Sequence, residues 1–236
     1  MLLRSDAYGT RVGLRVAAVD VDALRGFLPF WWVDTADDAT PDLVFDVPVV
    51  AGARSVVAEL ELAVAERAEG LVFVHAAVVA AGGRALLLPG PSYAGKSTLV
   101  DALVRAGATY CSDEYAPLGP DGVVHPYPRP LVLRDAAGVR VATVGGGVAA
   151  APPVERPLPV AAVAVVRYRD GARYRPRSLT TGAGVLALLE NTVCARSRPG
   201  EALTAATAVA AGARMVVGDR GAAADAAGPL LALLSG

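Results

Sequence analysis

Lysine is almost absent from this sequence. Of its 22 basic residues only Lys96 is a lysine, and all the others are arginines. Cysteine is also rare, and two cysteines in 236 residues exclude a disulfide framework and favour reduced thiols in a cytoplasm. A lone ammonium group in a chain that otherwise uses arginine indicates a specific chemical requirement at residue 96.

Membrane-length apolar runs and an excess of one charge are also missing. Although 54% of the residues are hydrophobic, Arg, Asp, Gly and Pro interrupt every apolar run before it could span a bilayer. The first residues, MLLRSDAYGT, meet an acidic residue too early to form a secretory signal. The net charge of -1 provides no basic field for nucleic acid. We therefore expect a soluble, cytoplasmic protein whose partners include neither nucleic acid nor membrane.

The chain length of 236 residues suits one α/β domain. We expect this single domain to have three parts: an N-terminal α+β appendage over 1–70, a core over 71–135, and C-terminal strands and helices over 136–236. The expected fold class is α/β, with a mixed β-sheet and flanking helices.

Hydrophobic periodicity predicts the elements within these parts. Residues 53–70 are typical of an amphipathic helix that buries Leu60 and Leu62 and exposes Glu61. Two β-rich runs over 71–90 are separated by Gly82-Gly83, a two-residue hairpin signal. The later elements are predicted to be a helix over 96–107, a strand over 109–112, a glycine- and proline-rich loop over 145–159, two strands joined at Asp170-Gly171, and Ala-rich helices up to the C-terminus.

A phosphate-binding loop lies between the second of these strands and the following helix. Residues 90–97 read GPSYAGKS and fit the pattern G-x-x-x-x-G-K-[ST]. Backbone N–H groups of such a loop bind phosphate, Lys96 adds a compact cation for the β- and γ-phosphates, and the Ser97 hydroxyl can ligate Mg²⁺. The planar fork of an arginine would not fit inside the loop, which explains the lysine. The predicted ATP- and Mg²⁺-binding residues are Gly90, Pro91, Ser92, Tyr93, Ala94, Gly95, Lys96, Ser97 and Thr98.

Two acids follow the next predicted strand. A right-handed strand–helix–strand connection places the end of the 109–112 strand beside the end of the strand before the loop. We therefore expect Ser112, Asp113 and Glu114 near the terminal phosphate. Asp113 is the predicted general base, and Asp113 and Glu114 join Ser97 as predicted metal ligands. The alternative is that the two acids cap the next segment.

A histidine reaches the same loop through the hairpin. With a two-residue turn at 82–83, the antiparallel register places His75 opposite Gly90. There, as a predicted catalytic residue, His75 could orient Asp113, contact the acceptor or donate to a phosphate when protonated. A histidine satisfied within an apolar core is the alternative.

Arginines supply the remaining candidates. Prolines hold the segment 125–134 extended, and Arg129 is a predicted substrate residue that clamps a phosphate or the acceptor, with an ordinary surface arginine as the alternative. The dense arginine cluster within 167–177 is interpreted as a solvated hairpin, with an acidic partner or a subunit contact as the alternative.

The segment from His75 to Glu114 resembles the catalytic core of the HPr serine kinase/phosphatase family, whose fold is akin to that of phosphoenolpyruvate carboxykinase. The family has a histidine in the strand before a Walker-type loop and an acidic pair after the next strand, and His75, Lys96 and Asp113 match these positions. Segments 121–134 and 157–168 look more like the HPr-kinase-related small kinases, which include lasso-peptide tail kinases and free-serine kinases.

This resemblance implies an HPr-kinase-like fold and transfer of a phosphoryl group from ATP, with Mg²⁺, to a serine-like hydroxyl, with Asp113 as base. The sequence departs from true HPr kinases in its Asp113-Glu114 pair, where they have two aspartates, and in lacking an E-[IL]-R-G-L-G segment. We therefore expect a small metabolite or a peptide as the acceptor in place of HPr. Family members can be oligomeric, so the resemblance leaves a homo-oligomer open.

Two other functions fit the same residues. The first is a nucleotide-binding regulatory module that keeps the loop and lacks transfer, and the second is a simple NTP hydrolase. The changed acidic pair leaves room for the first, as does Tyr93, which stands where such loops often have glycine and is either a surface residue or a lid.

Overall fold

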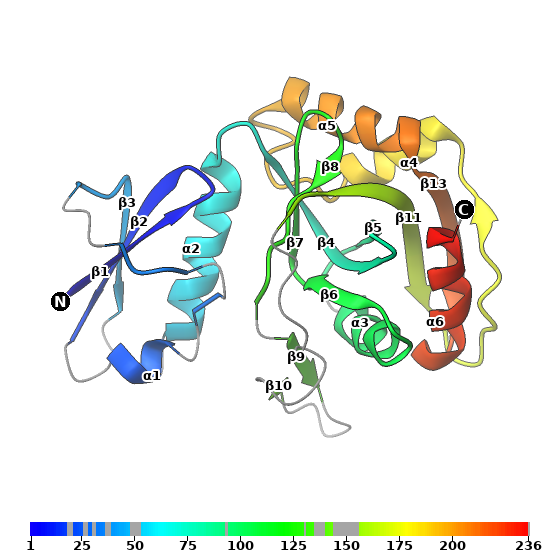
Figure 1. Cartoon of the computed structure of the whole chain (residues 1–236), viewed down its shortest axis with the longest axis horizontal. Coiled ribbons are helices and arrows are strands. Elements are labelled where there is room, and N and C mark those ends of the chain that lie inside the picture. The colour runs from blue at the N-terminus through cyan, green and yellow to red at the C-terminus, as the bar shows by residue number, and fades with distance from the viewer. Residues whose placement is uncertain are drawn as a thin grey trace. The chain divides into compact units, whose positions relative to one another are not determined.

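The computed structural model describes residues 1–17, 21–25, 28–29, 32–35, 39–47, 53–92, 94–129, 131–134, 140–143 and 156–235. The chain divides into two compact units, Met1–Leu71 and Val72–Gly236, whose elements are labelled in Figure 1. None of the helices among the described residues has both the length and the apolar composition that a membrane crossing requires.

The described residues of the first unit form a three-stranded sheet and two helices. Its elements are β1 (Leu2–Ala7), β2 (Thr10–Val16), α1 (Val21–Arg25), β3 (Leu43–Val47) and α2 (Ala53–Arg67). Helix α2 confirms the predicted helix, but Glu61 is buried at 2% exposure and Leu62 is 43% exposed. The prediction for these two side chains is wrong because the buried face of α2 runs through Val57, Glu61 and Val64 at helical spacing.

Among its described residues, the second unit contains one mixed sheet of eight strands. Its strands are β4 (Val72–Ala81), β5 (Arg84–Pro89), β6 (Thr109–Ser112), β7 (Tyr115–Leu118), β8 (Val123–Val124), β11 (Leu158–Tyr168), β12 (Arg177–Ser178) and β13 (Arg214–Arg220). The order is β12-β13-β11-β5-β4-β7-β8, with β6 also paired to β4. Strand β11 is parallel to β5 and β13, whereas β4 is antiparallel to its neighbours. A separate antiparallel pair is formed by β9 (Leu131–Arg134) and β10 (Arg140–Thr143).

Helices cover both faces of this sheet, as Figure 1 shows. They are α3 (Lys96–Arg105), α4 (Thr181–Leu189), α5 (Pro199–Gly212) and α6 (Ala223–Leu231), followed by the short 3-10 helix η3 (Ala232–Leu234). On one face Val78 shares a core with Val209 of α5, and on the other face Val79 shares a core with Leu103 of α3 and Leu230 of α6. Successive strand residues point to opposite faces, so a strand covered on both sides is apolar throughout. The unit is therefore an α/β fold with a mixed sheet, as predicted.

The β4–β5 hairpin has the register that the sequence predicts. Ala81 pairs with Arg84, and the ladder continues to Ala76 opposite Pro89. One step farther, the Gly90 N–H donates to the His75 carbonyl at 3.2 Å. The expected position of His75 opposite Gly90 is confirmed, because a two-residue turn leaves the ladder no other register.

The predicted neighbour relation between β5 and β6 is wrong. Strand β4 lies between them and pairs with both in antiparallel orientation. Two strands that are each antiparallel to the same neighbour point in the same direction, so the carboxyl ends of β5 and β6 still share one edge of the sheet. The rule for strand–helix–strand connections sets direction and handedness, but it does not exclude an intervening strand.

The C-terminal half differs more from the prediction. Residues 169–176 form no strand, and the two-residue β12 pairs with β13, so the expected hairpin at Asp170-Gly171 is wrong. Strand β13 itself lies within a stretch that was predicted to be helical. Within the predicted loop over 145–159, residues 145–155 lie outside the described residues and Leu158 begins β11.

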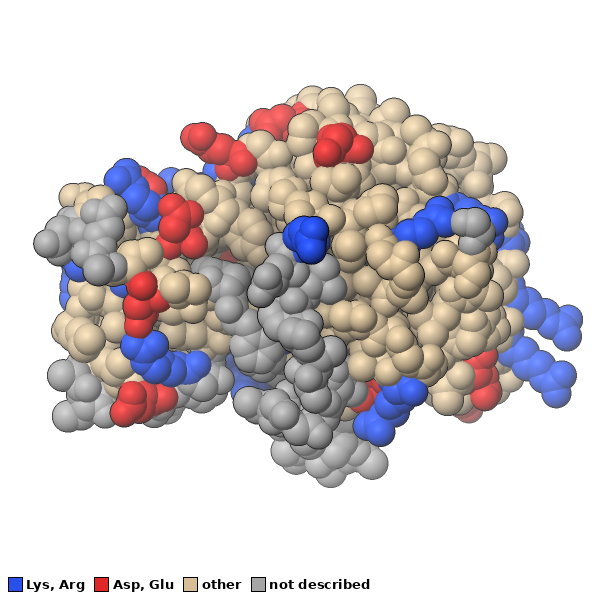
Figure 2. All heavy atoms as spheres, viewed as in Figure 1, with Lys and Arg blue, Asp and Glu red and all other residues tan. Residues whose placement is uncertain are grey.

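The arginine cluster of this region is exposed. Arg173, Arg175 and Arg177 have exposed side chains, and Figure 2 shows basic side chains extending from the edge where β12 lies. Elsewhere on the face in Figure 2, acidic and basic residues are interspersed.

Candidate functional site

The G-x-x-x-x-G-K-[ST] motif forms the connection between β5 and α3. Gly95 directly precedes the helix with φ +79°, a left-handed conformation that favours glycine. N–H groups in the first turn of a helix have no partner within the helix, so this end of α3 is suited to an anion. The loop and first turn contain the predicted binding residues Gly90, Pro91, Ser92, Ala94, Gly95, Lys96, Ser97 and Thr98, whereas Tyr93 lies outside the described residues.

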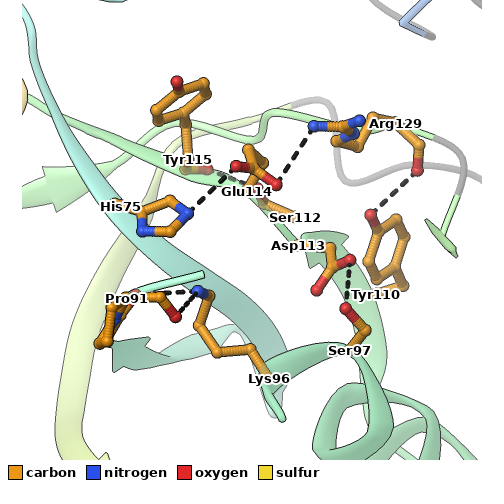
Figure 3. Close-up of polar contacts among 11 residues, drawn as sticks. His75, Pro91, Lys96, Ser97, Tyr110, Ser112, Asp113, Glu114, Tyr115 and Arg129 are labelled. Carbon is orange, nitrogen blue, oxygen red and sulfur yellow. Dashed lines mark hydrogen bonds and ion pairs between the residues drawn. The ribbon is translucent and has the colours of Figure 1, made fainter. Parts of the chain in front are cut away.

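Lys96 bends back over this loop. Its Nζ donates to the carbonyl oxygens of Gly90 at 2.8 Å and Pro91 at 2.9 Å. Burial lowers the pKa of Lys96, while the negative charges of Glu114 and Asp113 act in the opposite direction. Figure 3 shows the ammonium group on the side of the loop that faces His75 and Glu114.

Asp113 follows the last residue of β6 and lies beside the first turn of α3. Its Oδ2 accepts a hydrogen bond from Ser97 Oγ at 2.9 Å, as Figure 3 shows, and the residue is 8% exposed. Its Oδ1 is buried and accepts no hydrogen bond from the described residues. Burial raises the pKa of Asp113 to about 7, although the Ser97 hydrogen bond and the charge of Arg129 oppose this. A carboxyl group with this pKa and one unused oxygen can bind a cation or accept a proton near neutral pH.

The carboxylate of Glu114 lies between the side chains of His75 and Arg129. Its Oε1 lies 3.1 Å from His75 Nε2 and its Oε2 lies 3.3 Å from Arg129 Nη1, as Figure 3 shows. Burial alone would raise the pKa of Glu114, but the His75 hydrogen bond and the Arg129 charge hold it below its ordinary value. Glu114 is therefore an ionised carboxylate at neutral pH.

Backbone contacts place these three side chains. The Ala76 N–H donates to the Glu114 carbonyl at 3.1 Å, which joins the β4 backbone beside His75 to the segment after β6. The buried Tyr110 hydroxyl donates to the Arg129 carbonyl at 2.9 Å and so ties Arg129 to β6. Hydrogen bonds to β4 and β6 thus hold His75, Glu114 and Arg129 in place.

The structure brings together His75, Lys96, Ser97, Asp113, Glu114 and Arg129, six side chains that sequence analysis singled out. Ser112 does not belong to this group. Its side chain is fully buried and its hydroxyl donates to the Tyr115 carbonyl. That Ser112 lies near the terminal phosphate stays a prediction, and its hydroxyl is already engaged by the backbone at Tyr115.

One residue of the site was not anticipated. Arg220, the last residue of β13, donates from Nη2 to the Gly95 carbonyl at 2.9 Å. The apolar run MVV at 215–217 is the signal for a short strand here, but it is hidden among Ala-rich segments that favour helix.

No protein-family model matches this sequence, and no curated protein matches it. Within the described part of the chain, no cluster of three or more His, Cys, Asp or Glu side chains could hold a metal ion. The loop and the side chains around it are therefore the features that bear on function.

Proposed function

We propose that this protein is an ATP- and Mg²⁺-dependent kinase that transfers the γ-phosphoryl group to a serine-like hydroxyl of a small metabolite or a peptide. This is the activity implied by its resemblance to the HPr kinase/phosphatase family. The observation that carries the proposal is the hydrogen bond from Ser97 to the buried Asp113, at 2.9 Å. It joins the anion-binding end of α3 to a carboxylate that keeps one oxygen unused.

The residues present fit a magnesium ion. Mg²⁺ is commonly held by one or two carboxylates and by substrate phosphates, so a three-residue cluster is not required. The Ser97 hydroxyl and the Asp113 carboxylate would hold the ion, and the unpartnered buried Oδ1 is the observation that favours this assignment. Both oxygens of Glu114 face other side chains, which makes it a weaker candidate ligand. When bound, Mg²⁺ would neutralise negative charge on the phosphate oxygens.

Asp113 is the proposed proton acceptor. A base works best when its pKa is near the pH of the reaction; without a metal, burial raises the pKa of Asp113 to about 7, and a bound Mg²⁺ would lower it. In the proposed step the proton of the acceptor hydroxyl moves to Asp113, the hydroxyl oxygen bonds to the γ-phosphorus, and the bond to the β–γ bridging oxygen breaks, which releases ADP. Lys96 stabilises the charge on the β- and γ-phosphates.

Glu114, His75 and Arg129 have a positioning role in this proposal. The ionised Glu114 holds His75 and Arg129 through its two oxygens. Two donors fixed in this way can orient an acceptor or a phosphate without moving during the reaction.

The test uses labelled ATP, Mg²⁺ and a panel of serine-containing peptides and hydroxylated metabolites. Asp113→Asn keeps the shape of the side chain and removes its charge. Asp121, exposed in the turn between β7 and β8, supplies the matched control Asp121→Asn. We expect transfer by the wild type and by the control, and a loss of at least about 100-fold in Asp113→Asn.

Each other outcome would indicate a different function. Phosphate release that is independent of every acceptor would indicate a hydrolase. ATP binding without release or transfer would indicate a regulatory module. Failure of the wild type to bind ATP at millimolar concentration with Mg²⁺ would overturn the assignment of the loop itself.

A further inference from the structure

Arg220 reaches the phosphate loop from a distant part of the sequence. It ends β13, which pairs in parallel with β11, and β11 pairs in parallel with β5. The carboxyl ends of these three strands therefore meet at one edge of the sheet, the place where α/β proteins bind their ligands. Arg220 and Gly95 meet there although 125 positions separate them.

The guanidinium group of Arg220 is buried against carbonyl oxygens. Nη2 donates to the Gly95 carbonyl and Nη1 donates to the Gly221 carbonyl, each at 2.9 Å, and the residue is 4% exposed. Its Cζ lies 5.4 Å from the centroid of the Tyr168 ring, which covers one side of the group. These contacts hold the guanidinium in one orientation.

No carboxylate among the described residues pairs with this buried charge. Neutral carbonyls stabilise a guanidinium less than an anion does, and a buried charge without a counter-charge is costly. Two carbonyl contacts also leave part of its five-donor fork unused. A role limited to bracing the loop would not require a charged group, since a neutral amide can donate to the same carbonyls.

The position of the Arg220 guanidinium indicates a role for its charge. A Cβ atom on Gly95 would lie 2.5 Å from Arg220 Nη2, so the guanidinium rests directly on the residue that precedes α3. The anion-binding end of α3 thus has Lys96 on the loop and Arg220 beside Gly95. Both cations are held by loop carbonyls.

We propose that Arg220 binds the phosphate chain of a nucleoside triphosphate in this loop, as a second cation beside Lys96. This inference rests on the proposed nucleotide site and extends it to β13. Its bond to the Gly95 carbonyl, which also accepts from the Leu99 N–H, fixes the guanidinium beside the first turn of α3, and its planar fork can bind two phosphate oxygens at once.

The experiment measures binding of ATP and of inorganic tripolyphosphate by calorimetry to the full chain. Arg220→Gln keeps amide donors for the carbonyls and removes the charge, Arg220→Lys keeps the charge, and Arg167→Gln is the matched control. Arg167 is an exposed arginine near the carboxyl end of β11. We expect Arg220→Gln to weaken both ligands by about 10- to 100-fold, since a hydrogen bond to a charged group contributes about 1.5–3 kcal/mol.

Arg220→Lys should recover part of this loss, and Arg167→Gln should change both affinities by less than about twofold at 0.15 M salt. Two outcomes would show that the phosphate role of Arg220 is wrong while the kinase proposal still stands. In the first, Arg220→Gln binds both ligands like the wild type. In the second, Arg220→Lys binds them as weakly as Arg220→Gln, although the melting temperature of Arg220→Lys is unchanged. If Arg220→Gln does not fold, the Lys variant alone decides, because a purely structural arginine would gain nothing from retained charge. If the wild type binds neither ligand, both proposals fail together.

Discussion

The buried Asp113 carboxyl predicts a large, pH-dependent stability effect. Its pKa is raised by burial from 3.8 in the unfolded chain to about 7 in the folded protein. The folded state therefore binds the proton more tightly, and stability is lost as the pH rises from about 4 to about 7. A difference of about 3 pKa units corresponds to about 4 kcal/mol in the free energy of unfolding. Asp113→Asn removes the ionisation. The free energy of unfolding of the variant, relative to that of the wild type, should therefore rise by about this amount between pH 4 and pH 8.

The assay is urea unfolding of both proteins at pH 4, 5, 6, 7 and 8, without nucleotide or metal, followed by far-UV circular dichroism. Groups remote from Asp113 titrate equally in both proteins, and the altered hydrogen bond to Ser97 adds a constant, so the change of the difference with pH reports Asp113 and the groups coupled to it. A difference between the two proteins that stays constant within about 1 kcal/mol over this range would refute the reasoning. Adding Mg²⁺ at pH 8 should stabilise the wild type and leave Asp113→Asn unchanged, because the variant lacks the anionic ligand.

Three further predictions follow from single contacts. Lys96→Arg keeps the positive charge, yet it should weaken ATP binding at least about tenfold in calorimetry, because a planar fork does not fit where an ammonium contacts two loop carbonyls. Tyr110→Phe removes the donor to the Arg129 carbonyl and should lower the free energy of unfolding by about 1 kcal/mol, measured by urea unfolding; no loss at all would contradict the contact. Gly122→Ala should lose about 2 kcal/mol or more, because φ is +80° and a Cβ would lie 2.8 Å from the backbone of α5, whereas Gly171→Ala, with φ +67° and open space, should lose only about 1 kcal/mol. Equal losses in the two glycine variants would show that the clash does not contribute.

Local pattern was sufficient for the loop and the hairpin. The motif at 90–97, the apolar strand before it and the amphipathic helix after it are each set by residues within one element. The register that places His75 opposite Gly90 follows from the length of one turn. These features were predictable because they depend on interactions between neighbours in the sequence.

The C-terminal strands were not predictable in the same way. The apolar run at 215–217 is too short to separate strand from helix by periodicity, and β12 has only two residues. Both become strands because β11 offers a parallel partner to β13, and β13 offers an edge to β12. Pairing between distant segments decided what local propensity left open.

The sequence by itself determined the loop between β5 and α3 and how the hairpin presents His75, because turn length and side-chain alternation act over a few residues. Only the tertiary structure decided that β4 separates β5 from β6, that Ser97 meets Asp113, and that Arg220 lies on Gly95. It also decided the protonation of Asp113, because burial depends on everything packed around a side chain and not on its neighbours in the chain.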